Sequence, residues 1–457
     1  MKTLLLNMSI HRPTYIFITA LFIRMVYLLL VVNQIGFDGL MTALPDTINY
    51  LKVADDFLNG TNYGENYILI FGPGYASFLA AILFISGKTS ILIVLIQVVL
   101  SSLSCVLIYN LALRLTDSSK TALIASILAI LSGTSISLSV VVLSDTLYFF
   151  MFLLGLSLYI KALEKTYWRL FICSGILIGS AILIRSIGQL FPLAMFIFAL
   201  PFICKKATFG SGIRIHFNKN LTIKVISGIC IVLLIQGVWI VRNYKVHDIA
   251  ILTSAGHGGI GNVAAFALEK IEGRNYREIR DEWHIMYKDQ HNLKVLSPKE
   301  SRNIDTAESK KIIKEHPWEV LGAYFSLTWE NLMAVNTLNR ILFPELKAEM
   351  IKFEYFWRKE PVKHSCFILS MIGLITLLCK RKYKIALILG IVYFYCASTI
   401  GFTRWQGSRL FFPGQIAWSI LIGYLSATTI NFIKLYCFRP KTSPNIDILP
   451  NKNENGY

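Results

Sequence analysis

Two aspartates occupy positions where a carboxylate could act as a base. Asp46 opens the segment PDTINYLKVADDFLNG, and Tyr50 lies one helical turn further along on the same face. Asp145 follows a long apolar run in VVVLSDTLYFFMF, where an ionisable residue is costly unless it has a function. A carboxylate can accept the proton of an attacking hydroxyl, and two together can hold a divalent cation. The alternative interpretation is that each aspartate caps the helix that it begins.

Four arginines stand where apolar runs end. Arg185 lies in ILIRSIGQL, Arg242 precedes Asn243 in WIVRNYKV, and Arg404 and Arg409 lie in TRWQGSRLFFP. Guanidinium groups bind phosphate through paired N–H groups, so this set suits a phosphate or pyrophosphate. The alternative is that each arginine extends to the lipid headgroups of a membrane.

Cysteines and histidines indicate neither a disulfide framework nor a zinc site. The eight cysteines lie within apolar runs or at their ends, and no CxxC pair occurs. The histidines are scattered, without the HxxxH spacing of a metal-binding helix. A divalent cation held by Asp46 and Asp145 stays open, and the sequence identifies no other cofactor.

Membrane helices must position these residues. Of the 457 residues, 54% are hydrophobic and 16% are charged, whereas soluble domains carry about 25% charged residues. The apolar residues come in blocks of about 20, the length that crosses a bilayer as a helix. The net charge of +18 comes from short Lys and Arg clusters between the blocks, which set orientation in a membrane and do not indicate nucleic-acid binding. The composition therefore excludes a soluble enzyme.

The predicted fold class is an all-α polytopic membrane protein with about ten transmembrane helices, juxtamembrane helices and a mostly helical external loop domain. Segment 73–87 is short for a crossing and is expected to lie beside the membrane or to re-enter it. The predicted spans are 14–35, 91–113, 121–142, 146–163, 168–184, 187–203, 222–241, 363–379, 384–400 and 411–433.

The distribution of Lys and Arg predicts the topology. With 73–87 not crossing, the four internal short loops carry 14 basic residues and the opposite short turns carry three. Both termini are then inside, and segments 36–90 and 242–362 are outside. This divides the chain into a transmembrane module (1–241, with the external loop 36–90), a large external loop (242–362), C-terminal transmembrane helices (363–439) and a disordered cytoplasmic tail (440–457).

Six blocks of the sequence resemble, in the same order, those of the GT-C membrane glycosyltransferases, in the branch of protein O-mannosyltransferases and lipid A aminoarabinose transferase. Ser186 replaces the proline that follows the family's arginine, and Ala76 replaces the second proline of the PGYP block. The blocks are PDTINYLKVADDFLNG, FGPGYASFLAAIL, SDTLYFF, GSAILIRSIGQLFPL, VRNYKVHDIAILTSAGHGGIGN and SRLFFPGQIAWSILIGYL.

The resemblance implies transfer of a sugar from a polyprenyl-phosphate donor to an acceptor glycan, lipid or protein at the outer face of the membrane. Asp46 would be the main catalytic residue, supported by Asp145. Substrate would be bound by Tyr50, Arg185, Arg242, Asn243, Arg404 and Arg409. No internal loop is large enough for a nucleotide-sugar domain, which fits a lipid-linked donor. A bacterial inner membrane is the expected location.

Two other functions stay open. A transporter or flippase of lipid-linked sugars would favour broken helices and internal repeats, which the sequence does not show. A polymerase or ligase of lipid-linked glycans would share the membrane and the outer arginines, and only the resemblance separates it from a sugar transferase.

Overall fold

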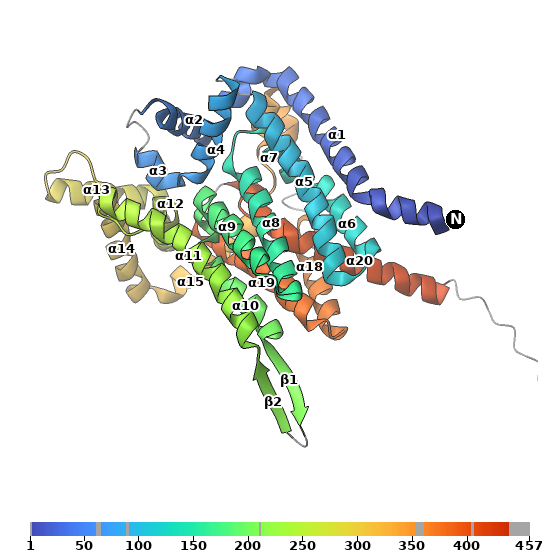
Figure 1. The fold of residues 1–457 in the computed structure, drawn as a ribbon. Helices are drawn as coiled ribbons and strands as arrows, with labels where there is room; N and C mark the ends of the chain where they lie inside the picture. Colours follow the sequence, from blue (N-terminus) through green and yellow to red (C-terminus); the bar gives the residue numbers. More distant parts are fainter. Residues whose placement is uncertain are drawn as a thin grey trace, which may run out of the picture.

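A computed structural model of the chain describes residues 2–60, 65–87, 91–209, 212–352, 361–403 and 406–437. Apolar helices form a bundle, and a group of more polar helices lies at one end of it (Figure 1). The bundle comprises α1 (Lys2–Thr42), α5 (Ile91–Thr116), α6 (Ser119–Ile130), α7 (Gly133–Val140), α8 (Ser144–Lys165), α9 (Trp168–Ile184), α10 (Phe191–Ile203), α11 (Lys219–His247), α18 (Pro361–Cys379), α19 (Tyr383–Thr399) and α20 (Gln415–Cys437).

Every predicted span coincides with a helix or a pair of helices. Within the described residues, six helices are long and apolar enough to cross a membrane, and a seventh crossing is possible if α6 and α7, bent by 51°, form one span. The other predicted spans, 168–184, 187–203 and 363–379, correspond to the shorter apolar helices α9, α10 and α18. Segment 73–87 forms the short helix α4 (Gly74–Ser86), which at about 1.5 Å per residue is shorter than the apolar core of a bilayer.

The helices of segment 36–90 dock at the same end of the bundle as those of segment 242–362, because α3 packs against α12. The first group is α2 (Pro45–Asn59), α3 (Glu65–Phe71) and α4. Pro45 begins α2 and Gly60 ends it, with Gly60 in the left-handed conformation at φ 70°. The second group comprises α12 (Ser254–Glu272), α13 (Tyr276–Gln290), α14 (Pro298–Glu315) and α15 (Pro317–Leu332), followed by α16 (Asn339–Leu342) and the 3₁₀ turn η3 (Pro344–Leu346).

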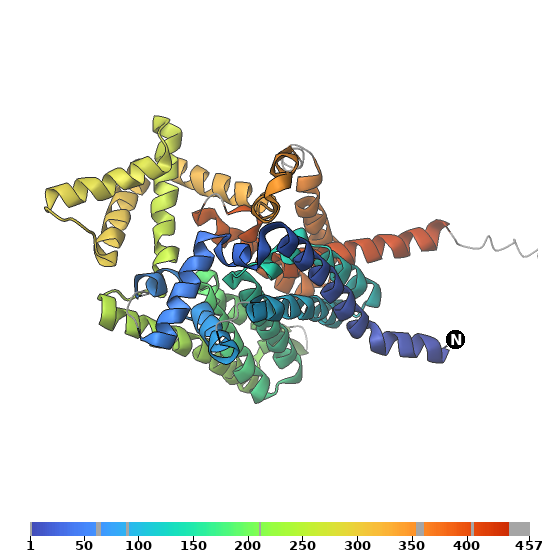
Figure 2. The same cartoon turned by 90° about the horizontal axis from the view of Figure 1, so that it is seen from above.

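These outer helices project sideways from the bundle in the view from above (Figure 2). Val263, Phe266, Ile279 and Leu327 are buried between α12, α13 and α15 and give the group a small apolar core of its own.

A β-hairpin is the one element of the described chain that falls outside the all-α prediction. Its strands β1 (Cys204–Phe209) and β2 (Gly212–Phe217) pair antiparallel, with Cys204 opposite Phe217. The hairpin lies at the far end of α10 and α11 from the outer helices (Figure 1), within the loop predicted to be internal. The second strand alone carries a sequence signal, since Ile213 and Ile215 alternate with Arg214 and His216 after the turn residues Gly-Ser-Gly.

A buried arginine joins α1 to the bundle. Arg24 is fully buried and donates hydrogen bonds to the hydroxyls of Ser101 (2.8 Å) and Ser135 (2.9 Å) and to the Cys105 sulfur (3.4 Å). A buried cation is costly unless its N–H groups find acceptors, and α5 and α7 supply them. Arg24 therefore fixes the packing of three helices and takes no part in the site described next.

Candidate functional site

Two aspartates and two arginines from distant parts of the chain meet at the end of the bundle that carries the outer helices. Arg409 donates from Nε to Asp145 (2.7 Å) and from Nη1 to Asp46 (3.0 Å). Arg185 forms an ion pair with the other oxygen of Asp145. The buried carboxylate of Asp145 thus pairs with both arginines, and the carboxylate of Asp46 pairs with Arg409.

A break between α7 and α8 places Asp145. Val141 and Leu143 are extended, so α8 begins anew at Ser144 with Asp145 in its first turn. Two side chains satisfy the carbonyl groups that the break exposes: Gln97 donates to Val141 (2.6 Å) and Thr47 donates to Val142 (3.0 Å). The carboxylate is favoured there because the N-terminus of a helix carries partial positive charge.

Two glycines of the FGPGY block place Arg185. Gly72 has a φ of 81°, which favours glycine, and a Cβ on Gly74 would lie 2.7 Å from the Ile184 nitrogen. This close approach packs the start of α4 against the end of α9. Arg185 follows as the extended residue after that helix, with its side chain 16% exposed.

Arg409 lies in the 3₁₀ turn η5 (Gly407–Arg409), between α19 and α20. Burial alone would lower its pKa, but the carboxylates of Asp145 and Asp46 outweigh burial and raise it. Arg409 is therefore a permanent cation. Its side chain is 14% exposed, so part of it stays accessible to a ligand.

Tyr50 lies behind the two aspartates. Its hydroxyl donates to Ser144 Oγ at 3.1 Å, and its ring packs edge-on against Tyr75. Burial raises the pKa of Tyr50, so the phenol stays protonated at neutral pH. Tyr50 therefore supports the start of α8 and also lines the cavity described next.

The site opens into a cavity of about 500 Å³. Asp46, Arg185 and Arg409 line it, whereas Asp145 is 2% exposed and lies behind the arginines. Asp46 has a side chain that is 33% exposed. The two carboxylates thus differ: Asp145 orients the arginines, and Asp46 is accessible to a reacting molecule.

An apolar groove of about 930 Å³ continues from the cavity. It lies between α10, α18 and α19, and the two hollows share Leu190, Tyr395, Thr399 and Phe402 as walls. A polar site with fixed cations therefore meets a long apolar surface. This combination suits a molecule with a charged head and a hydrocarbon tail.

The geometry does not fit the divalent cation that Asp46 and Asp145 were predicted to share. Arginine N–H groups already occupy both oxygens of Asp145 and one oxygen of Asp46, in the space where a cation would lie. In the parts of the chain that the structure describes, no group of three or more Asp, Glu, His or Cys residues is arranged to hold a metal.

Two predicted substrate-binding residues lie away from the cavity. Asn243 is fully buried and donates to the carbonyls of Ile251 (2.9 Å) and Leu252 (3.1 Å), which fixes the turn after α11. Arg242 packs over the Trp239 ring and donates to Asn243. Arg404 lies outside the described residues.

The helix-capping alternative is wrong for both aspartates. The N-cap residue is Leu44 in α2 and Leu143 in α8, and no side chain makes a capping hydrogen bond at either N-terminus. Instead, both carboxylates accept hydrogen bonds from arginine side chains.

The outer helices contribute a cavity residue that the sequence gave no reason to select. Asn262 on α12 lines the cavity and accepts a hydrogen bond from Arg280 (3.1 Å). Arg280 also binds both oxygens of Asp305, which His284 contacts at 3.0 Å. Burial raises the pKa of Asp305, but the hydrogen bonds from His284 and Arg280 outweigh burial and lower it. Asn262 is thus held over the cavity by a charged network.

Comparison with known proteins gives a family match and a fold. Residues 72–217 match the family described as dolichyl-phosphate-mannose-protein mannosyltransferase. No curated protein matches the sequence.

Two solved structures of an oligosaccharyltransferase from Archaeoglobus fulgidus share the fold. The archaeal oligosaccharyltransferase AglB, in complex with an inhibitory peptide and a dolichol-phosphate, is 13% identical, with a TM-score of 0.53 over 98% of this chain and 53% of that chain. The enzyme tethered to an acceptor peptide containing the NVT sequon is also 13% identical, with a TM-score of 0.51 over 93% of this chain and 50% of that chain. The chain spans about half the length of these enzymes.

Proposed function

We propose that this membrane protein transfers a sugar from a polyprenyl-phosphate donor. The family match over residues 72–217 and the shared fold support the resemblance to GT-C glycosyltransferases. The acceptor is a glycan, lipid or protein at the extracytoplasmic face.

The observation that carries the proposal is that Arg185 and Arg409 line a polar cavity which shares four wall residues with a long apolar groove. A polyprenyl phosphate needs both surfaces: cations for the phosphate and an apolar wall for the tail. Asp145 holds both guanidinium groups in place before the donor arrives, so little reorganisation is required on binding. Two fixed arginines then stabilise the phosphate as its negative charge grows.

Asp46 is the proposed general base. The bond between the sugar C1 and the phosphate oxygen breaks, a bond from the acceptor oxygen to C1 forms, and the acceptor proton passes to Asp46. The phosphate leaves as an anion on Arg185 and Arg409. Donor phosphate would also compete with Asp46 for the Nη1–H group of Arg409, which frees the carboxylate to accept the proton.

The distribution of charge supports the outer face. The site lies at the end of the bundle where α2 and α12 gather, and the hairpin of β1 and β2, within a basic loop, lies at the other end (Figure 1). Basic loops favour the cytoplasmic side.

The confinement of these groups to one end of the bundle favours a transferase over a flippase, which would need polar groups along a path through the membrane. A polymerase or ligase would use the same end, and an experiment must separate it from the sugar transferase.

The test compares cells with and without the gene by mass spectrometry of envelope glycans and lipid-linked sugars. A sugar transferase predicts that one sugar is lost from the glycan while its polyprenyl-phosphate form accumulates. Accumulation of a complete lipid-pyrophosphate-linked glycan would point to the ligase or polymerase. Unchanged glycans and lipid-linked sugars would contradict the proposal.

A further inference from the structure

A second pocket lies on the other side of the segment that carries Arg409. It encloses about 250 Å³ between the end of α15, the α6–α7 bend, α18 and α20. Ser408 and Phe411 line this pocket, whereas Arg409 and Leu410 line the cavity of the arginine–aspartate site. Residues 408–411 therefore separate the two spaces, and a ligand in the pocket would contact the segment that positions Arg409.

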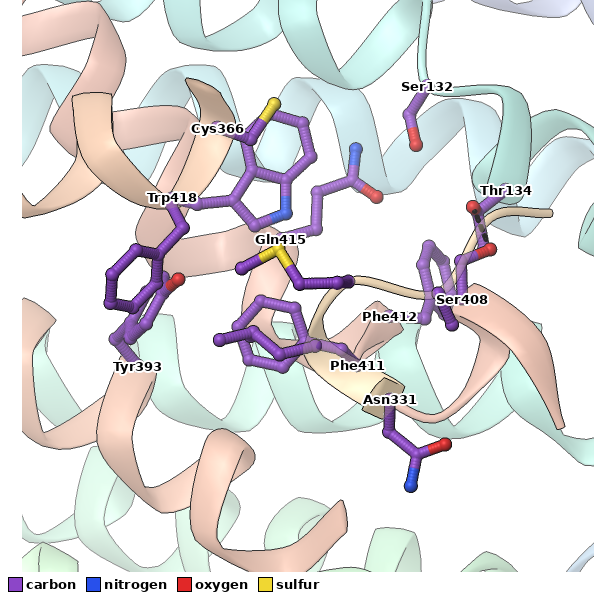
Figure 3. A pocket seen from close by; sticks show the side chains of 14 residues that line it. Ser132, Thr134, Asn331, Cys366, Tyr393, Ser408, Phe411, Phe412, Gln415 and Trp418 are labelled. Carbon is purple, nitrogen blue, oxygen red and sulfur yellow. Dashed lines mark hydrogen bonds between the residues drawn. The ribbon is translucent and has the colours of Figure 1, made fainter. Parts of the chain in front are cut away.

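The pocket contains a buried polar group without a partner. Gln415 is 2% exposed, and its Oε1 atom is buried and accepts no hydrogen bond from the described residues. An unsatisfied buried amide oxygen destabilises the folded protein, and a hydrogen-bond donor from a ligand would offset that cost. Other polar groups stand nearby: the hydroxyls of Thr134 and Ser408 share a hydrogen bond of 2.7 Å, and Asn331 lies at the pocket edge (Figure 3).

Aromatic rings form the opposite wall. In Figure 3, Trp418 and Tyr393 lie across the pocket from the Thr134–Ser408 pair. Among the described residues that line the pocket, there is no Asp, Glu, Lys or Arg. A ligand that matches this wall is uncharged, with an apolar face for the rings and hydroxyls at its rim. A sugar ring has both, because its C–H groups form a face and its hydroxyls lie around the edge.

We infer that this pocket binds one uncharged sugar unit of the acceptor. Its volume equals that of roughly eight liquid water molecules at about 30 Å³ each, which suits a single ring and excludes a long chain. The donor's phosphate and tail have their own surfaces in the cavity and the groove, so the pocket is left for the other substrate. The assignment to the acceptor rests on the proposed transferase function.

The first experiment uses Gln415→Leu, with Gln236→Leu as the matched control. Gln236 is also a buried glutamine with an unpartnered amide atom, but it lies on α11 and lines neither the pocket nor the cavity. Loss of one neutral hydrogen bond predicts a rise in acceptor KM of roughly ten-fold for Gln415→Leu. The donor KM should not change, the thermal midpoint should not fall, and the control should keep both wild-type KM values. An unchanged acceptor KM in folded Gln415→Leu would overturn the inference.

The second experiment needs no activity and uses wild-type protein. Cys366 lines the pocket and is exposed, so its alkylation by a maleimide can be followed by peptide mass spectrometry, with the exposed Cys173 as an internal control. Methyl glycosides should slow alkylation of Cys366 and not that of Cys379, which is exposed at the other end of the same helix and is the more water-accessible control. Protection by lipid and not by any glycoside would refute the sugar assignment.

If no donor supports transfer but a glycoside still protects Cys366, the proposed function fails while the pocket remains a sugar site. If transfer occurs without protection and without a KM change, only the pocket assignment fails.

Discussion

Replacing Asp46 by Asn removes the proposed base and little else. The side chain keeps its shape, and its oxygen can still accept from Arg409 Nη1, which lies 3.0 Å from Asp46 in the wild type. Arg409 also keeps its bond to Asp145. Because the Asp46 side chain is 33% exposed, solvent screens its pair with Arg409, and the loss of stability should be below about 1 kcal/mol.

The catalytic effect should be much larger than the effect on stability. Loss of a general base lowers the rate on the order of 10²-fold, which corresponds to about 2.7 kcal/mol in the activation barrier. The expected result is a fall in kcat of at least that size, with an unchanged donor KM, because Arg185 and Arg409 remain.

The assay is steady-state transfer in proteoliposomes, with kcat and both KM values, together with the thermal unfolding midpoint. The matched control is Asp55→Asn, on the exposed side of the same helix, which should retain wild-type turnover. A general base contributes on the order of 10²-fold or more to the rate. If Asp46→Asn keeps more than about a tenth of wild-type kcat, Asp46 is therefore not the base.

Three further results are expected. Asp145→Asn removes the buried negative charge that pairs with Arg185 and Arg409 and should destabilise the protein by about 3–5 kcal/mol in denaturation measurements; a wild-type midpoint would contradict this. Arg185→Lys keeps the charge but loses the paired N–H groups, so donor KM should rise while thermal stability is nearly unchanged; an unaltered donor KM would remove Arg185 from the phosphate site. A chelator should not slow transfer, because arginines occupy the space between Asp46 and Asp145, and a rate restored only by added divalent cation would refute this arrangement.

The outer network gives a prediction of its own. Arg280→Ala removes the bidentate partner of Asp305 and the donor to Asn262. Amide hydrogen exchange should become faster in α13 and α14 but not in α8. The pKa of Asp305 is lowered in the folded protein, so its stabilising contribution is present at neutral pH and is lost as the pH falls through that lowered value. Equal exchange in the variant and the wild type would contradict this role.

The sequence could predict those parts of the molecule that depend on local signals. Pro45 and Gly60 mark the ends of α2, and the apolar blocks locate the bundle helices. The bounds of the short spans could not be predicted: the span 187–203 contains only the 13 helical residues of α10, because a 3₁₀ turn at Ser186–Gly188 precedes that helix. The hairpin was missed because a basic loop between spans resembles an ordinary connection.

The sequence could not show which of the candidate arginines and asparagines come together at the site, because that depends on the packing of distant helices. Arg185, Arg242 and Arg409 all lie beside apolar runs, yet of these three only Arg185 and Arg409 contact the aspartates. Asn243 was predicted to bind substrate, but its side-chain amide donates to the carbonyls of Ile251 and Leu252 and so fixes the turn after α11. Asn262 lines the cavity because α12 packs over it, and no local pattern in SAGHGGIGN indicates that position.

The most direct test of the account measures transfer from a polyprenyl-phosphate sugar by Arg409→Ala and by Arg114→Ala. Arg114 also forms an ion pair, 2.9 Å from Glu164, but at the far end of α8, roughly 28 Å from Asp145 at about 1.5 Å per residue. The account predicts that Arg114→Ala transfers at the wild-type rate, while Arg409→Ala binds donor weakly and loses on the order of 10²-fold or more in kcat/KM. Equal kcat/KM values for the two variants would contradict a phosphate site at Arg409.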